Sequence, residues 1–170
     1  MGKKHPNVTH LNEVEPRILE KGNKFAFTGK RLAHASGAKL LGCAWYEVPP
    51  GKTAFPNHYH CANEEGVFIL EGSGQARIGK DTVPVEKGDY LAYPPGPEYA
   101  HALKNTGNGP LRYICISTMI TTEIVGYPDS KKIAGAGCID PASGIMGAKV
   151  RFIIKEQPSV DYYEGEDVDD

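Results

Sequence analysis

Three histidines and one glutamate, in two separated segments, are the residues with the clearest chemical potential. His58 and His60 are two positions apart, Glu65 follows them, and His101 lies much further along the chain. Residues i and i+2 of a strand point to one face, so His58 and His60 would project together, with Glu65 joining them from the next strand. Converging neutral imidazoles and a carboxylate suit a divalent transition metal with open coordination positions. The alternative is a set of polar strand residues facing solvent.

Short β-strands would have to position these residues. Runs rich in β-branched and aromatic residues recur, and Gly or Pro interrupts almost every window long enough for a helix. The expected strands are Phe25–Phe27, Leu40–Val48, Gly66–Leu70, Gln75–Ile78, Tyr90–Tyr93, His101–Leu103, Leu111–Ile120 and Val150–Lys155. Residues 127–147 are rich in Gly, Ala and Pro and are expected to be irregular. This spacing predicts an all-β, antiparallel sandwich or barrel.

Length and composition exclude several classes of protein. A chain of 170 residues suits one domain, and 19 basic against 21 acidic residues give no field that favours nucleic acid or a membrane surface. No stretch approaches the roughly 18 apolar residues of a membrane span. Four widely spaced cysteines without a C-x-x-C pair indicate reduced thiols and a cytoplasmic location. Six acidic residues among the last ten are expected to form a short solvated tail.

The first histidine segment resembles the first motif of the cupin superfamily, G-x5-H-x-H-x(3,4)-E-x6-G. The matching positions are Gly51, His58, His60, Glu65 and Gly72. Six residues rather than five separate Gly51 from His58, a departure that falls in a loop.

The second segment resembles the other cupin motif, G-x5-P-x-G-x2-H-x3-N. The matching positions are Gly88, Pro94, Gly96, His101 and Asn105. Four residues instead of two precede His101, again in a loop, so we expect both departures to alter the shape of a pocket rather than abolish metal binding. Fifteen residues separate the two motifs, a spacing similar to that of small microbial cupins.

The resemblance implies that His58, His60, Glu65 and His101 are the ligands of one divalent metal ion per chain, with Fe, Mn, Ni and Zn all open. Glu64 and Glu65 are adjacent and would point to opposite faces. Counting six residues back from the motif glycine selects Glu65 as the ligand.

The resemblance also implies a jelly-roll β-barrel built from one copy of the motif pair. We therefore expect a single domain over residues 1–170, with a core at about 36–122, an irregular N-terminal arm at 1–35, and a C-terminal arm at 123–170 that carries the acidic tail. Cupins tend to pair through their sheets and N-terminal strand, which implies a homodimer.

Four further residues are candidates for contacts with a substrate. Tyr46 and Arg77 would contact an oxygen-rich molecule, Arg77 through paired donors to a carboxylate or phosphate, although both would also suit a plain sheet surface. Tyr99 shares the parity of His101 and would reach the mouth of the barrel or pack over a loop. Glu64 is a nearby carboxylate.

The functional expectation is a metal-dependent enzyme that acts on a small oxygen-rich molecule. The wider chain resembles monocupins of the sugar-phosphate-isomerase-like type, which makes isomerisation the first hypothesis. A dioxygenase or decarboxylase is the second, because a metal with open positions serves those reactions as well. A non-catalytic cupin that only binds a small ligand is the third.

Overall fold

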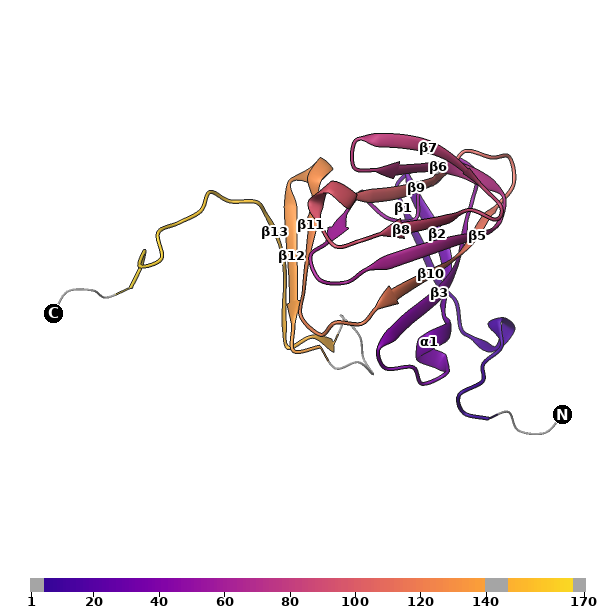
Figure 1. Ribbon diagram of the computed structural model, residues 1–170, viewed down its shortest axis with the longest axis horizontal. Coiled ribbons are helices and arrows are strands. Elements are labelled where there is room, and N and C mark those ends of the chain that lie inside the picture. Colours follow the sequence, from indigo (N-terminus) through magenta and orange to yellow (C-terminus); the bar gives the residue numbers. More distant parts are fainter. Residues whose placement is uncertain (1–4, 140–146, 167–170) are drawn as a thin grey trace.

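The computed structural model of the chain describes residues 5–139 and 147–166, and its named strands pair in three antiparallel sheets (Figure 1). The largest sheet has the order β1 (Arg17–Lys21), β2 (Phe25–Arg31), β3 (Leu41–Val48), β10 (Leu111–Thr118), β5 (Glu65–Glu71) and β8 (Tyr90–Tyr93). The second has the order β13 (Val150–Lys155), β12 (Lys132–Gly137), β11 (Glu123–Tyr127) and β4 (Tyr59–His60). The third has the order β7 (Asp81–Glu86), β6 (Ser73–Ile78) and β9 (His101–Asn105). The helical segments are η1 (Leu11–Glu13), α1 (Leu32–Ala35), η2 (Pro97–Tyr99) and η3 (Pro128–Ser130).

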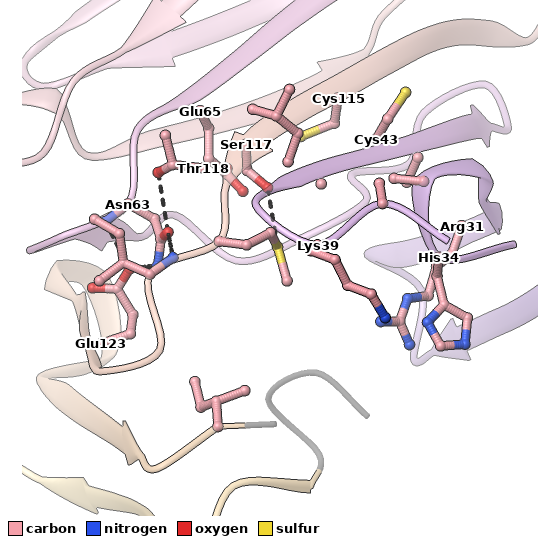
Figure 2. A pocket seen from close by; sticks show the side chains of 18 of the residues that line it. Arg31, His34, Lys39, Cys43, Asn63, Glu65, Cys115, Ser117, Thr118 and Glu123 are labelled. Carbon is pink, nitrogen blue, oxygen red and sulfur yellow. Dashed lines mark hydrogen bonds between the residues drawn. The ribbon is translucent and has the colours of Figure 1, made fainter. Parts of the chain in front are cut away.

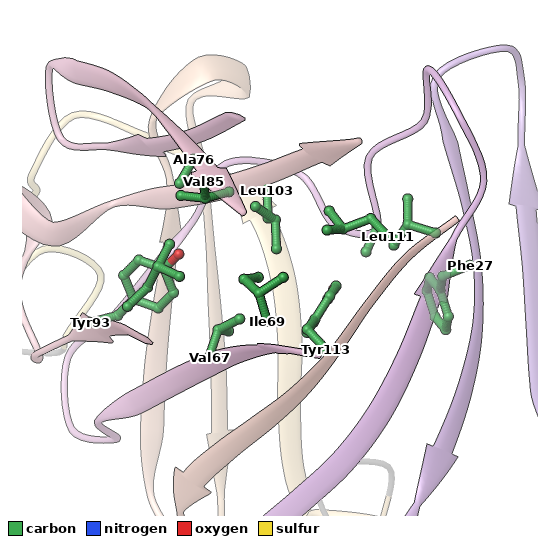
Figure 3. Close-up of a cluster of buried hydrophobic side chains, with 12 residues drawn as sticks. Phe27, Val67, Ile69, Ala76, Val85, Tyr93, Leu103, Leu111 and Tyr113 are labelled. Atoms are coloured by element: carbon green, nitrogen blue, oxygen red, sulfur yellow. The ribbon is translucent and has the colours of Figure 1, made fainter. Parts of the chain in front are cut away.

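These sheets enclose an apolar core, and the expected all-β, antiparallel architecture is confirmed. Figure 3 shows core side chains from opposite walls pointing toward one another. On β5, Val67 and Ile69 are buried, whereas Phe68 and Leu70 are 41% and 36% exposed. Buried and exposed side chains therefore alternate along this strand, and Glu65 shares the inner face with Val67 and Ile69.

The last glycine of the first motif allows the sharp reversal from β5 into β6. Gly72 has a φ of +85°, and a Cβ atom there would lie 2.5 Å from the carbonyl oxygen of Pro110. Only glycine avoids both the strained conformation and the clash, so glycine at this position lets the β5–β6 turn pack closely against Pro110.

The barrel extends beyond the expected core of residues 36–122. Strands β1 and β2 complete one edge of the largest sheet, and β11, β12 and β13 make most of the second sheet. The expectation that residues 127–147 are irregular is wrong for residues 132–137, which form β12. A Cβ atom on Gly135 of that strand would collide with the ring of Phe152 on β13, so small residues are needed where aromatic rings cover the strand. Residues 140–146 lie outside the described chain.

Two further strands have physical reasons for escaping detection in the sequence. Strand β7 contains Pro84, which lacks an N–H for the ladder, but β7 pairs only with β6 and is therefore an edge strand where proline is tolerated. Strand β1 is mostly exposed and polar and is also at an edge.

Two simpler expectations concern thiols and membranes. The four cysteines are all free. Within residues 5–139 and 147–166, no helix has both the length and the apolar character needed to cross a membrane.

Candidate metal centre

Two of the candidate ligands are brought together by the backbone itself. The N–H of His58 donates to the carbonyl oxygen of His101 at 3.1 Å, and the N–H of His101 donates to the carbonyl of His58 at 2.7 Å. This isolated bridge joins the loop before β4 to the start of β9 and leaves the two ring centroids 4.6 Å apart. Residues 43 positions apart in the chain are thereby fixed as neighbours.

Glu65 and His60 complete the cluster. Oε2 of Glu65 lies 3.3 Å from Nε2 of His101 and 3.7 Å from Nε2 of His60. One possible ligand atom from each of His58, His60 and Glu65 lies within 4.8 Å of the others. His58, His60 and Glu65 therefore form the group that could hold a metal ion, and His101 lies beside it, next to Glu65 and His58.

The other ring nitrogen of each histidine is already engaged. Nδ1 of His58 lies 2.8 Å from the carbonyl oxygen of Pro56, and Nδ1 of His101 lies 3.0 Å from the carbonyl oxygen of Tyr99. A carbonyl only accepts, so both Nδ1 atoms carry the proton, and the lone pair of each neutral ring is on Nε2. This is the tautomer that a metal-binding imidazole needs.

Glu123 engages Nδ1 of His60 in the same way, although it was not among the residues predicted from the sequence. Its Oε2 lies 3.2 Å from Nδ1 of His60. It begins β11, 63 residues beyond His60, and belongs to neither motif. A lone acidic residue at the start of a short strand carries no recognisable signal, so only the pairing of β11 with β4 reveals the contact.

Glu123 is itself held firmly. Its carboxylate accepts hydrogen bonds from the backbone N–H groups of Cys61, Ala62, Asn63 and Ile124 at 2.9–3.1 Å and from the side-chain amide of Asn63. Burial of this 4% exposed residue opposes ionisation, but the hydrogen bonds outweigh it and lower the pKa of Glu123 to about 2. Glu123 is therefore a fixed anion behind His60.

The low pKa of His58 favours metal binding, because only the neutral imidazole can bind a metal ion. Burial, followed by the nearby charge of His101, lowers the pKa of His58 to about 4. Burial also opposes the charged form of His60, but the hydrogen bond to Glu123 and the charge of Glu65 outweigh it and raise the pKa of His60. Burial opposes ionisation of Glu65, yet its hydrogen bond with His101 and the histidine charges lower the pKa of Glu65. Near neutral pH, a neutral imidazole thus stands beside an ionised carboxylate.

The donor set fits a metal ion. Nδ1 of His101 donates to the carbonyl oxygen of Tyr99, and its Nε2 lies only 3.3 Å from a carboxylate oxygen of Glu65. Two acceptors at this distance require a proton or a cation between them. Nε2 of His60 is buried without a hydrogen-bond partner among the described residues. Three nitrogens and one oxygen also suit a divalent transition metal.

Two cavities meet at these ligands. The larger, of about 870 Å³, is lined by all four ligand residues and by polar and aromatic side chains that include Tyr46, Tyr93 and Tyr127. The smaller, of about 320 Å³, shares His60 and Glu65 with it and extends toward the open end of β3 and β10 (Figure 2). Both are also lined by Tyr46.

Of the four predicted substrate contacts, Tyr46 is the one that lines these cavities. Arg77 instead forms a two-point ion pair with Asp129, with Nη1 2.8 and 2.9 Å from its carboxylate oxygens. Tyr99 holds His101 through its backbone carbonyl, and its side chain lines neither cavity. The backbone N–H of Glu64 donates to Thr118, and its side chain also lines neither cavity.

Tyr93 also lines the larger cavity, although it was not among the residues predicted from the sequence. Its ring stacks on that of His101 with centroids 3.8 Å apart, and its buried hydroxyl has no hydrogen-bond partner among the described residues. Tyr93 ends a strand that was predicted, and its parity with Leu91 marks it as inward-facing, so the available signal was alternation along β8.

Comparison with known proteins agrees with this architecture. Residues 44–117 match the family described as Cupin domain. An uncharacterized protein of Methanocaldococcus jannaschii is 39% identical over 112 residues, which are 64% of this chain and 83% of that protein. A sugar phosphate isomerase structure from Silicibacter pomeroyi has a TM-score of 0.73 at 22% identity and covers 86% of this chain and 91% of its own, which shows a shared fold. A predicted oxalate decarboxylase structure from Thermotoga maritima has a TM-score of 0.58 at 26% identity, over 66% of this chain and 99% of its own.

Proposed function

The chain belongs to the cupin superfamily, and from that premise we propose that it is a metal-dependent enzyme acting on a small oxygen-rich molecule, with isomerisation of a sugar phosphate as its reaction. The observation that carries the proposal is the convergence of His58, His60, Glu65 and His101 on the wall of a cavity of about 870 Å³. A polar cluster of this kind within an otherwise apolar pocket is typical of an active site.

A divalent transition metal bound by these four residues would polarise a carbonyl or hydroxyl oxygen of the substrate and stabilise negative charge that develops there. The chain's own residues orient the substrate. Burial raises the pKa values of Tyr46 and Tyr93, so both hydroxyls stay protonated and donate hydrogen bonds to substrate oxygens. Val67 and Phe152 line the same cavity and give it apolar surface.

Decarboxylation or oxygenation is the second candidate function. It is supported by the similarity to the predicted oxalate decarboxylase at 26% identity. The same ligand set serves both candidates, so the reaction must be separated by product: an isomer of the substrate, carbon dioxide, or consumption of dioxygen.

Turnover by the metal-loaded protein tests the proposal. A panel of sugar phosphates, hydroxy acids and keto acids would be assayed with the wild type, with His101→Ala, and with His5→Ala as a control, since His5 is exposed and lines neither cavity. We expect activity in the wild type and in His5→Ala, with loss of both metal and activity in His101→Ala. Equal, background-level conversion by all three proteins across the panel would refute an enzymatic role and favour a cupin that only binds its ligand.

For the quaternary structure we propose a homodimer. The outer face of the largest sheet carries the exposed apolar side chains of Phe68, Tyr90 and Ile116 from three adjacent strands. Apolar side chains gathered on one face favour a covering partner, and a second copy of the chain is the simplest one. Sedimentation velocity measures this directly.

A further inference from the structure

The smaller cavity carries a group of basic residues at the end remote from the metal centre. Arg31, His34 and Lys39 line that end, His60 and Glu65 line the other, and Arg17 lines both this cavity and the larger one. Figure 2 shows Arg31, His34 and Lys39 gathered on one side of the pocket, with Glu65 and Glu123 on the other. The cavity therefore has a basic end and a metal-binding end.

Strand register explains why the two arginines face this cavity. Arg17 pairs with Gly29, and Gly29 pairs with Tyr46, whose ring points inward. Cross-strand partners point to the same face of a sheet, so Arg17 shares the inner face with Tyr46. Arg31 lies two residues beyond Gly29 and has the same orientation.

In the part of the chain that the structure describes, no carboxylate forms an ion pair with these basic groups. None of the ion pairs within residues 5–139 and 147–166 involves Arg17, Arg31 or Lys39. By contrast, Arg112 on the outer face of the same sheet binds Glu47 and Glu71. Cations that line a cavity without a protein partner leave their attraction available to an anionic ligand.

We infer that this cavity binds the phosphate end of a short polyhydroxy phosphate ester whose other end reaches the metal centre. The inference rests on the proposed function and adds the residues that select the substrate. Two guanidinium groups offer paired donors to phosphate oxygens, and Lys39 adds a compact charge, so together they match a dianion better than a single carboxylate.

The sheet sets the length of the ligand. Arg31 on β2 and Glu65 on β5 are separated by two strands, β3 and β10, which makes three interstrand spacings. The register places Val67 of β5 in line with Arg31, and Glu65 lies two residues from Val67. Steps of about 4.8 Å and a rise of about 3.3 Å per residue place their backbones about 16 Å apart along the sheet. The side chains and the metal ion occupy much of this distance, so a short sugar phosphate fits and a nucleotide does not.

Binding measurements test the inference independently of turnover. Isothermal titration of the metal-loaded protein would use ribose 5-phosphate, ribose and gluconate as probes, with Arg31→Gln and Lys39→Gln as variants. Lys87→Gln is the matched control, because Lys87 is exposed and lines neither cavity. All three side chains are exposed, so folding should be preserved.

We expect the affinity for ribose 5-phosphate to fall about tenfold in each variant, because each loses a charge-assisted contact, and to weaken further at high salt. Ribose binding, metal content and the Lys87→Gln control should not change. Equal affinity for ribose and ribose 5-phosphate in the wild type would overturn the inference, as would gluconate binding as tightly through the same residues. If the wild type shows no turnover but Arg31→Gln and Lys39→Gln still lose affinity for ribose 5-phosphate alone, the proposed function is refuted and the anion site is supported.

Discussion

The substitution Glu123→Gln separates the role of the carboxylate behind His60 from that of the metal ligands. Glutamine keeps the size of the side chain and one accepting oxygen, but its NH₂ group faces backbone N–H donors that the carboxylate now satisfies. The contacts around Glu123 include three consecutive backbone N–H groups, those of Cys61, Ala62 and Asn63. The substitution therefore leaves buried donors without an acceptor, which is costly.

The pKa of Glu123 supplies the magnitude. A fall from the ordinary 4.5 to about 2 corresponds to about 3 kcal/mol of stabilisation of the ionised folded state. A loss of that size lowers the melting temperature of a domain of this length by about 6–12 °C. Because His60 also loses the partner that fixes its tautomer, we expect metal affinity to fall about 10- to 100-fold.

The assay compares the wild type, Glu123→Gln and the exposed control Glu86→Gln, first after treatment with a chelator and then in a metal titration. The folded pKa of Glu123 lies below its unfolded value, so its stabilisation is present above about pH 4.5 and is lost as the pH falls toward about 2. The difference in stability between wild type and Glu123→Gln should therefore shrink over that interval. Equal melting temperatures and metal affinities for all three proteins at pH 7 would refute the reasoning.

Two further predictions concern proton competition and packing. Because His58 has a pKa of about 4 while the pKa of His60 is raised, His60 accepts a proton first, and the metal content after dialysis should fall as the pH drops through the ordinary imidazole range near about 6.5. Constant metal content down to pH 4 would contradict histidine ligation. Gly126→Ala places a methyl group against the ring of Tyr59 and should lower the free energy of unfolding by about 1–3 kcal/mol. Chemical denaturation should show part of this loss recovered in Gly126→Ala/Tyr59→Ala, and no recovery would point to another cause.

The sequence was most informative where chemistry and spacing coincide. His58, His60, Glu65 and His101 could be selected because two glycine- and proline-bounded motifs frame them; the structure groups the first three and places His101 3.3 Å from Glu65. The strands with clear alternation, such as β5, were likewise predictable from the sequence, because a sheet buried on one face requires that pattern.

The features that could not be predicted from the sequence depend on tertiary contacts. Glu123 acts through strand pairing across 63 residues, and no local pattern encodes that distance. Strand β12 is rich in glycine and alanine because aromatic neighbours cover it, which reverses the usual preference for large strand residues. The basic residues of the smaller cavity come from the edge strand β1, the end of β2 and the loop before β3, so no single segment of the sequence marks them.

The reciprocal backbone bridge between His58 and His101 has an evolutionary consequence. Main-chain atoms make both hydrogen bonds, so replacing either side chain leaves the two positions at the same separation. Single substitutions at residues 58 and 101 can therefore exchange one donor atom for another on an unchanged frame. Such a frame lets descendants of this chain alter their preference for a metal without first having to redesign the barrel.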